Sequence, residues 1–447
     1  MLHTLTVTEL AARIRAGELS PVAVVEACLA RIQDVERAVK AWVRIDESVA
    51  LDAARLLESE ARAGRFRGPL HGIPVGLKDI YHVAGMVTTS GASAFAHEQP
   101  LTDADAVARL KQAGAIVLGK TTTTEFAYLD PTVTRNPWNL EHTPGGSSSG
   151  SAAAVAARMV PVALGSQTVG STLRPAAYCG IVGLKPTHGR ISTTGATPLA
   201  WSLDHAGIFT RSVEDAALML SVLADGESTS GPRAMLPPVD YVDAVRSEMR
   251  PPRLGLVRDL YRDRASPQVK ANMDEATAIF SQAGAIVEET ALPPAAAAIH
   301  DAGQLVMRVE AATFHAERFA RHADSYRPKI RGLIEAGLTT FATKYVSAQQ
   351  SRQRFREEMS PIFRRYDALL MPVVPAAAPK GLSTTGDPFF CAPWSFAGVP
   401  SIAVPSGVSD DGLPLAIQLV TATFAEDRLL AVARWCESTL PLMPALP

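Results

Sequence analysis

The sequence predicts an α/β protein in which helices cover both faces of a β-sheet. Short runs rich in β-branched residues alternate with helical segments after about residue 65, and such alternation is typical of this architecture. The first 65 residues carry helical cap signals instead. Of the 447 residues, 47% are hydrophobic and 20% are charged, so the chain can bury a large core. Length alone allows about three domains.

Three helices are expected before residue 65. Thr6 and Glu9 have the spacing of a capping box, and Gly17 ends the helix that follows them. Ser20-Pro21 opens a second helix, because proline at the first turn costs no hydrogen bond. A third, amphipathic helix is expected from about Val49 to Arg62.

Seven apolar runs are the expected strands. The segments "KQAGAIVLGK" (111–120) and "SQAGAIVEET" (281–290) share a core in which a helix ends at glycine and a buried strand follows. In chain order, the seven runs are "GIPVGL", "AIVLG", "GIVGL", "RLGLV", "AIVEE", "ALLMPVV" and "LAIQLV".

Two stretches stand apart from this alternation. The polar, proline-containing "ADGESTSGPRAMLPP" (224–238) is the best candidate for a boundary within the chain. Residues 300–360 form a long, helical, charge-rich segment. This segment is interpreted either as a cap or partner surface or as an ordinary solvated layer of helices.

Charge and cysteine usage bear on partners and compartment. Lys and Arg total 43 against 45 Asp and Glu, with no basic stripe, so neither nucleic acid nor an anionic membrane is expected as a partner. The N-terminal "MLHTLTVTEL" lacks secretory features, and the most apolar stretch, Ala152 to Leu164, is too short to cross a bilayer. The protein is therefore expected in the cytoplasm, with four buried free thiols: Cys28, Cys179, Cys391 and Cys436.

Two familiar motifs match the sequence in the wrong structural context. The run from Gly114 to Thr121 fits the Walker A pattern, but a helix is expected before it and a strand inside it, which inverts the order of a P-loop. The run from Gly146 to Gly150 fits the G-x-S-x-G elbow around Ser148. An elbow follows directly on a strand, whereas "TRNPWNLEHTP" before this run is expected to be a loop.

Neither a metal nor another cofactor is expected. The chain has no H-E-x-x-H motif and no Cys/His pair at ligand spacing. An α/β-hydrolase esterase stays open as an alternative. The histidines it would need follow the loop but lie in uninformative settings: His188, His205, His300, His315 and His322.

Three stretches carry chemistry. In "HGIPVGLKD" (71–79), Lys78 ends a buried strand, where desolvation would lower its pKa and make it a usable base. In "PGGSSSGSAAAVAA" (144–157), a Gly/Ser loop runs into an Ala-rich helix. In "LGSQTVGSTLRPAAYCGIVGLKPTHGRIS" (164–192), the turn Thr168–Ser171 could aim several backbone N–H groups at one point, as an oxyanion hole requires.

Together these stretches resemble the amidase signature family, including its malonamidase-like, aryl acylamidase and urethanase-type members. The likeness extends through "GAIVLGKTTTTEFA", "NPWN" and "FAGVPSIAVPSG", and covers about residues 5–438. It implies the amidase-signature fold, a mixed sheet sandwiched between helices in one domain, 1–447. The expected parts are N-terminal helices (1–65), a catalytic core (66–224) and a C-terminal part (225–447).

The resemblance implies a Ser–cis-Ser–Lys triad. Lys78 matches the lysine, Ser147 the bridging serine after a cis Gly146–Ser147 bond, and Ser171 the nucleophile. The other serines of the loop, Ser148, Ser149 and Ser151, are expected to hold the loop and start the helix. Backbone N–H groups would hold the oxyanion, donated by Thr168, Val169, Gly170 and Ser171.

This chain departs from the family pattern near the nucleophile. Val169 stands where many members have glycine, Thr172-Leu173 where many have Ile-Arg, and Gln167 where Asp is frequent. Arg174 either holds a substrate carboxylate or braces the Gly/Ser loop. The expected substrate-binding residues are Gly146, Arg174, Tyr128, Leu129, Gly195, Phe390 and Trp394.

The expected function is hydrolysis of C–N acyl bonds, other than peptide bonds, in small amides, anilides or carbamates, with urethanase and esterase activity as variants. The substrate is expected to be a small molecule, and the protein a monomer or homodimer with no nucleic-acid or membrane partner. A second class is the A subunit of a tRNA-dependent amidotransferase, against which the balanced charge, Gln167 and Val169 argue. A pseudoenzyme is disfavoured because Lys78, Ser147 and Ser171 are intact.

Overall fold

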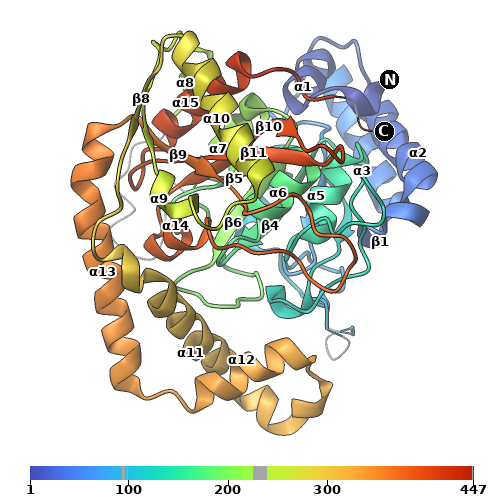
Figure 1. The fold of residues 1–447 in the computed structure, drawn as a ribbon. Coiled ribbons are helices and arrows are strands. Elements are labelled where there is room, and N and C mark those ends of the chain that lie inside the picture. The colour runs from blue at the N-terminus through green and yellow to red at the C-terminus, as the bar shows by residue number, and fades with distance from the viewer. Residues whose placement is uncertain (93–95, 98, 225–238, 445, 447) are drawn as a thin grey trace.

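The computed structural model describes residues 1–92, 96–97, 99–224, 239–444 and 446. Among these residues the strands form one mixed sheet with helices on both sides, as Figure 1 shows, so the predicted fold class is confirmed. Of the predicted boundary segment 224–238, residues 225–238 lie outside the described residues. The division of the chain at 65 and 224 stays a prediction.

The sheet has the strand order β1-β3-β2-β4-β6-β5-β10-β11-β9-β7-β8. Its strands are β1 (Trp42–Ile45), β2 (Pro74–Lys78), β3 (Ile116–Thr121), β4 (Val162–Gln167), β5 (Val182–Lys185), β6 (His205–Thr210), β7 (Arg253–Leu256), β8 (Ile286–Glu289), β9 (Ala368–Pro372), β10 (Ser401–Val408) and β11 (Pro414–Val420). Strands β3, β2 and β4 run parallel, as do β9, β7 and β8. The strands between β4 and β9 pair antiparallel.

Helices surround this sheet. They are α1 (Val7–Arg15), α2 (Pro21–Val39), α3 (Glu47–Arg62), α4 (Asp105–Gln112), α5 (Ser149–Ala156), α6 (Leu173–Cys179), α7 (Val213–Leu223), α8 (Tyr241–Arg246), α9 (Arg258–Tyr261), α10 (Pro267–Gln282), α11 (Ala296–His322), α12 (Pro328–Leu338), α13 (Ala342–Arg365), α14 (Ala392–Ala397) and α15 (Glu426–Thr439). Short 3-10 turns lie at Leu2–Thr4, Glu125–Ala127 and Ala323–Ser325.

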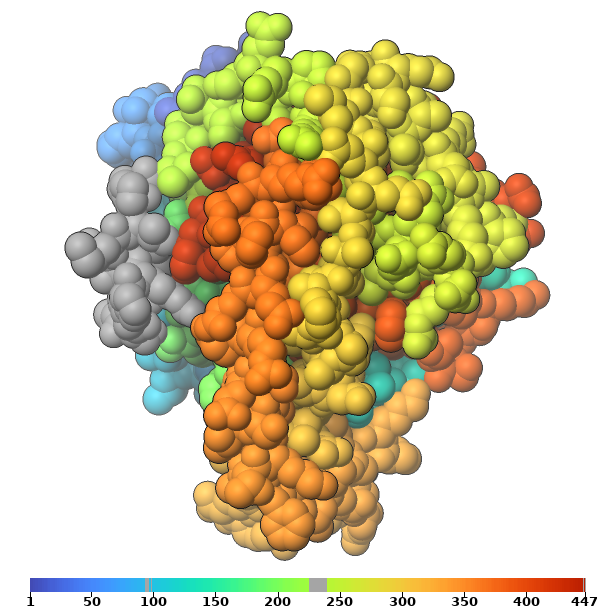
Figure 2. Space-filling model, turned by 60° about the vertical axis from the view of Figure 1, so that its left-hand side comes forward, coloured from blue at the N-terminus to red at the C-terminus, as the bar shows by residue number. Residues whose placement is uncertain are grey.

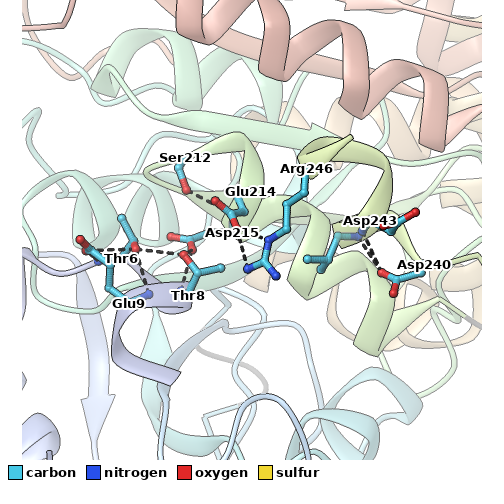
Figure 3. Close-up of polar contacts among 10 residues, drawn as sticks. Thr6, Thr8, Glu9, Ser212, Glu214, Asp215, Asp240, Asp243 and Arg246 are labelled. Atoms are coloured by element: carbon cyan, nitrogen blue, oxygen red, sulfur yellow. Dashed lines mark hydrogen bonds and ion pairs between the residues drawn. The ribbon is translucent and has the colours of Figure 1, made fainter. Parts of the chain in front are cut away.

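The predicted N-terminal helices are confirmed. Thr6 and Glu9 form both bonds of the capping box, and Ser20 caps α2, whose first residue is Pro21. Figure 3 shows Asp215 of α7 beside Thr8 of α1. The Asp215 carboxylate accepts bonds of 2.9 Å from the backbone N–H groups of Val7 and Thr8. The Asp215 carboxylate therefore accepts from backbone N–H groups in the first turn of α1, which have no acceptor within the helix itself.

Two apolar clusters fill the space between the sheet and its helices. Along β4, Val162 and Leu164 belong to one cluster and Ala163 to the other, because successive side chains of a strand point to opposite faces. The first cluster includes residues of α1, α7, α10 and α15, and the second includes residues of α2, α3, α5 and α6. The four cysteines are buried and free, as predicted.

The segment predicted to be helical at 300–360 contains α11, α12 and α13. Figure 1 shows these helices projecting from one side of the molecule, and Figure 2 shows α13 beside α11 on the surface. We call α11–α13 the helical arm. Its base meets the body at α14, and its inner side reaches the cavity described below. Within the described residues, no helix has the length and apolar character needed to span a membrane.

Candidate active site

Lys78 is the last residue of β2, a strand in which every residue is buried. Its Nζ lies 2.7 Å from Ser147 Oγ and 2.7 Å from Ser166 Oγ. Burial lowers the pKa of Lys78 to about 7, against an opposing effect of the nearby Asp204 carboxylate. A large neutral fraction near pH 7 gives this amine the free lone pair that a base needs.

Ser147 follows a cis peptide bond with Gly146, as the resemblance implied. The serines after it hold the loop, also as expected. Ser149 Oγ donates to the Gly145 carbonyl, and Ser148 Oγ exchanges hydrogen bonds with the Ser166 backbone. The loop therefore closes on β4 and passes into α5 at Ser149.

The turn with Ser171 connects β4 to α6. Gln167 Oε1 accepts from the backbone N–H groups of Thr172 and Leu173 at 2.8 and 2.9 Å, and its Nε2 donates to Ser395 Oγ. The amide side chain thus caps the start of α6 and anchors the turn to α14. The substitution of Gln for the more frequent Asp keeps an acceptor at this position and adds a donor.

A cavity of about 310 Å³ opens beside this turn. Its walls are mainly apolar side chains together with the backbone of the turn, a composition typical of small-molecule sites. The lining includes all of the predicted oxyanion residues, the last of which is also the predicted nucleophile: Thr168, Val169, Gly170 and Ser171. Tyr128 and Leu129, predicted to bind substrate, also line it.

Arg174 lies one turn after Ser171 and lines the same cavity, although only 1% of the residue is exposed. Its Nη2 donates to the Gly146 carbonyl at 2.6 Å, and its Nη1 donates to the Gly386 carbonyl at 2.6 Å. The guanidinium therefore ties α6, which follows the predicted nucleophile Ser171, to the Gly146–Ser147 peptide. Of the two interpretations of Arg174, these contacts favour the brace.

Four predicted substrate-binding residues, Gly146, Gly195, Phe390 and Trp394, do not line this cavity. Phe390 and Trp394 are fully buried in the apolar core, where Phe390 packs on Tyr261 and Trp394 on Phe355. These two predictions are wrong, because α14 begins just after Phe390 and turns both rings inward. Gly195 lines a neighbouring cavity instead. The carbonyl of Gly146 accepts a hydrogen bond from Arg174.

The aromatic wall of the cavity is Phe389, which sequence reasoning missed. His300 from the helical arm stacks on its ring, with centroids 4.0 Å apart and planes 10° apart. Arg264 lies 3.8 Å from the ring centroid. Other arm residues of this wall are Gln304, Met307 and Lys329.

A second cavity, of about 250 Å³, shares Ala127 and Leu199 with the first. Ser166 and Asp204 line it. Asp204 accepts from Thr168 Oγ1 at 2.6 Å and from the backbone of the loop 199–200, and burial raises its pKa to about 6. Sequence reasoning also missed Ser166, which lies in β4, the strand that pairs parallel with β2.

Among the described residues, no three His, Cys, Asp or Glu side chains gather in a way that could hold a metal ion. Ser171 and the backbone of Thr168–Ser171 line the first cavity, whereas Lys78 and Ser147 are fully buried and contact each other.

Comparisons with known proteins support this description. The model of the Amidase family matches residues 23–430. The A subunit of glutamyl-tRNA(Gln) amidotransferase from Geobacter sp. (strain M21) is 35% identical over 470 residues, which cover 97% of this chain and 96% of that protein. The corresponding protein of Myxococcus xanthus is 37% identical, again over 97% of this chain and 96% of the relative.

Solved structures give the same result. An inhibitor-bound structure from work on a vestigial complex and the origins of an s-triazine catabolic enzyme matches with a TM-score of 0.91 and 28% identity, over 98% of this chain and all of that one. The A subunit of glutamyl-tRNA(Gln) amidotransferase from Thermotoga maritima matches with a TM-score of 0.84 and 28% identity, over 100% and 99% of the two chains.

These findings correct one expectation. The sequence predicted a monomer or homodimer that acts on a small molecule and has no nucleic-acid partner. That prediction is wrong, because the relatives that match nearly the whole chain are subunits of an amidotransferase named for a tRNA. Its physical basis was weak as well, since a chain-wide charge balance shows neither where basic residues gather nor what a partner protein contributes.

Proposed function

This chain belongs to the amidase family, and we propose that it breaks the C–N bond of a primary carboxamide as the A-type subunit of an amidotransferase. The ammonia released would serve a transfer to a tRNA-linked acceptor on a partner subunit. The cytoplasmic location expected from the sequence is part of this proposal.

One observation carries the chemical part: the buried amine of Lys78 lies 2.7 Å from Ser147 Oγ. A lysine whose pKa is about 7 can take a proton from a serine hydroxyl, whereas an ordinary surface lysine is protonated at that pH. In the proposed transfer, the proton moves from Ser147 in the Gly/Ser loop to Lys78 at the end of β2.

In the proposed reaction, Lys78 accepts the proton of Ser147 while Ser147 accepts the proton of Ser171. The Ser171 oxygen forms a bond to the carboxamide carbon, and the backbone N–H groups of Thr168 to Ser171 stabilise the oxyanion. The proton then passes back through Ser147 to the leaving nitrogen, the C–N bond breaks and ammonia leaves. Water cleaves the acyl-enzyme by the same relay in reverse.

The amidotransferase part of the proposal is supported by likeness along the whole chain. Identities of 35% and 37% extend over more than nine-tenths of both this chain and the two amidotransferase proteins. The helical arm lies within the aligned length, and it offers exposed apolar side chains on α11 and α13, Phe314 and Val346, to a partner.

A second candidate is hydrolysis of a bulkier amide, anilide or carbamate, with ester cleavage as a side activity. The observation that favours it is the apolar wall of the cavity, formed by Met307, Phe389 and Leu129. The amide and the carbamate share the acyl carbon and the leaving nitrogen, so the same relay would serve either substrate.

The experiment compares the wild type with Ser171→Ala. Ammonia release is measured from L-glutamine, L-asparagine and simple carboxamides, and chromophore release from p-nitroanilides, aryl carbamates and p-nitrophenyl esters. A second assay puts this chain in place of its counterpart in the Myxococcus xanthus amidotransferase and measures amide transfer to glutamyl-tRNA(Gln).

We expect ammonia release and amide transfer, both lowered at least ~10³-fold by Ser171→Ala. Turnover of anilides or carbamates without ammonia release or transfer would replace the first candidate by the second. Equal rates for the wild type and Ser171→Ala on every substrate would refute the assignment of the nucleophile.

A further inference from the structure

Lys78 has two serine partners at the same distance, and the proposed relay uses only one of them. Ser147 Oγ and Ser166 Oγ each lie 2.7 Å from its Nζ. The second partner comes from β4, the strand parallel to β2, and stands five residues before the nucleophile. The proposed relay therefore does not account for the buried contact between Lys78 and Ser166.

The lone pair and the N–H bonds of a neutral amine explain what this contact can do. A neutral lysine has one lone pair and two N–H bonds, whereas a base needs the lone pair directed at the hydroxyl it deprotonates. If the Ser147 hydroxyl donates into the lone pair, an N–H of Lys78 points away from Ser147 and requires an acceptor. Ser166 Oγ is at hydrogen-bond distance to be that acceptor.

Ser166 is itself held in place. Its backbone N–H donates to Ser148 Oγ at 3.1 Å, and Ser148 Oγ donates to its carbonyl at 3.2 Å. On the other side of the strand pair, Ser166 is in register with Ala206 of β6. The Gly/Ser loop and the sheet thus fix the acceptor with respect to Ser147, and a rigid acceptor orients the amine.

The charged groups around Lys78 do not supply an alternative anchor. Asp204 acts on it only through the electrostatic field, and no hydrogen bond joins the two residues among the described residues. Asp79, the next residue, makes an ion pair with Lys120 at 2.9 Å and accepts from Thr89. The Tyr81 hydroxyl donates to the Gly165 carbonyl.

We propose that Ser166 is a positioning residue of the relay: it accepts an N–H of Lys78 and so directs the lone pair of the amine at Ser147. The inference rests on the proposed function, since it assumes that Lys78 is the base. Ser166 also lines the second cavity and does not line the cavity beside Ser171.

The test uses Ser166→Ala, Ser166→Thr and a matched control, Ser151→Ala. Ser151 is also a buried serine, and its hydroxyl forms hydrogen bonds with the Leu164 carbonyl and Thr121, whereas the described hydrogen bonds of Lys78 Nζ go to Ser147 and Ser166. Steady-state kinetics are measured on the amide that the wild type turns over fastest, from pH 5 to 10. The titration of Lys78 is followed by NMR in lysine-labelled protein, with Lys78→Met to assign the signal.

For Ser166→Ala we expect kcat to fall about 10- to 100-fold with little change in KM, because the base is misdirected while the substrate cavity is intact. The acidic limb of the pH profile should move to lower pH, since the ammonium form of Lys78 loses an acceptor. Ser166→Thr keeps the hydroxyl and should restore both properties. Ser151→Ala should lower thermal stability and leave the pH limb in place.

A Ser166→Ala variant with wild-type kcat and an unmoved limb would overturn the inference, as would equal defects in the Ala and Thr variants. The NMR titration separates this inference from the proposed function. If the wild type turns over no amide, the proposed function fails. A Lys78 titration shifted by Ser166→Ala and not by Ser151→Ala would still establish the orienting bond.

Discussion

Thr168 Oγ1 donates a hydrogen bond of 2.6 Å to Asp204 Oδ1, and this bond joins the turn before Ser171 to the loop before β6. The loop is held in turn by the helical arm. Ser202 in the loop donates to Glu310 of α11 through both its backbone N–H and its hydroxyl, and its carbonyl accepts from Arg352 of α13. The loop that contains Ser202 and Asp204 therefore connects the arm to the turn with the predicted oxyanion donors.

Replacement of Asp204 by Asn should change both the rate and its pH dependence. The amide nitrogen cannot accept from Leu199 N or Ala200 N, so the turn at Thr168 loses support and kcat falls. Loss of the carboxylate also lowers the pKa of Lys78, so the acidic limb of kcat/KM moves to lower pH. The measurement is a pH–rate profile.

The matched variant is Thr168→Val, which removes the bond to Asp204 and keeps the carboxylate. It should lower kcat without moving the acidic limb to lower pH. A wild-type profile for Asp204→Asn would show that neither the field nor the support of Asp204 matters to the reaction.

Lys78 should also make stability rise with pH. Its folded-state pKa of about 7 lies below the ordinary lysine value, so between these two values the unfolded chain binds more protons than the folded one. The free energy of unfolding then increases with pH above 7, by at most about 1.4 kcal/mol per pH unit for this residue. Lys78→Met should remove that increment and abolish turnover.

Lys185 is the control for this prediction. Burial lowers its pKa to about 7 as well, but it donates to the Val399 carbonyl and contacts neither Ser147 nor Ser166. Lys185→Met should flatten the same part of the stability curve and leave the pH profile of turnover unchanged. Urea unfolding of the wild type, Lys78→Met and Lys185→Met at pH 7 and pH 9 measures the change of stability with pH. Rate measurements across the same pH range give the pH profile of turnover. A slope in Lys78→Met equal to that of the wild type would contradict the assigned pKa, since the contribution of Lys185 should remain and that of Lys78 should be absent.

Much of the fold follows from local patterns in the sequence. All seven predicted runs are strands, since each has enough β-branched or leucine side chains to stand out. The four strands without a prediction have weaker patterns. Strand β4 contains Gly165 and Ser166, and β10 contains Pro405 at an irregularity of its pairing with β11. Strand β4 lies between β2 and β6, and β10 lies between β5 and β11, so their burial depends on partners such as β2 and β5 that are distant in sequence.

The residues of the site also fall into those that the sequence could predict and those that it could not. Lys78, Ser147 and Ser171 lie in compact motifs, so the resemblance could assign them, and the structure brings the first two into contact. Phe390 was predicted in place of Phe389 because composition does not show which side of a turn faces a cavity. Asp204 could not be predicted, since its partner Thr168 is 36 residues away and no motif links them.

The docking of α1 should depend on one buried carboxylate. Asp215 accepts from two backbone N–H groups of α1 and from Thr8 Oγ1, and Asn at this position has a single acceptor oxygen. We expect Asp215→Asn to lower the free energy of unfolding by about 1–3 kcal/mol. Glu214→Gln, which removes an ion pair with Arg246 on the exposed side of α7, should cost less than about 1 kcal/mol. Urea titrations that give equal losses would contradict this difference.

Arg174 should act on the geometry of the relay rather than on the charge of the substrate. Its fork spans the carbonyls of Gly146 and Gly386, and a lysine ammonium cannot reproduce that planar pair of bonds. Arg174→Lys should therefore lower kcat by a similar factor for neutral and anionic amides of the same acyl length, with unchanged KM ratios.

The comparison of the two substrate classes decides between brace and carboxylate binder. Arg174 already donates hydrogen bonds to two carbonyls inside the protein. Loss of those bonds should displace the peptide that positions Ser147. A defect confined to anionic substrates, and expressed in KM, would instead show that its remaining donors bind a substrate carboxylate. A uniform defect in kcat, together with a fall in unfolding free energy, would establish that α6 and the Gly/Ser loop share one guanidinium.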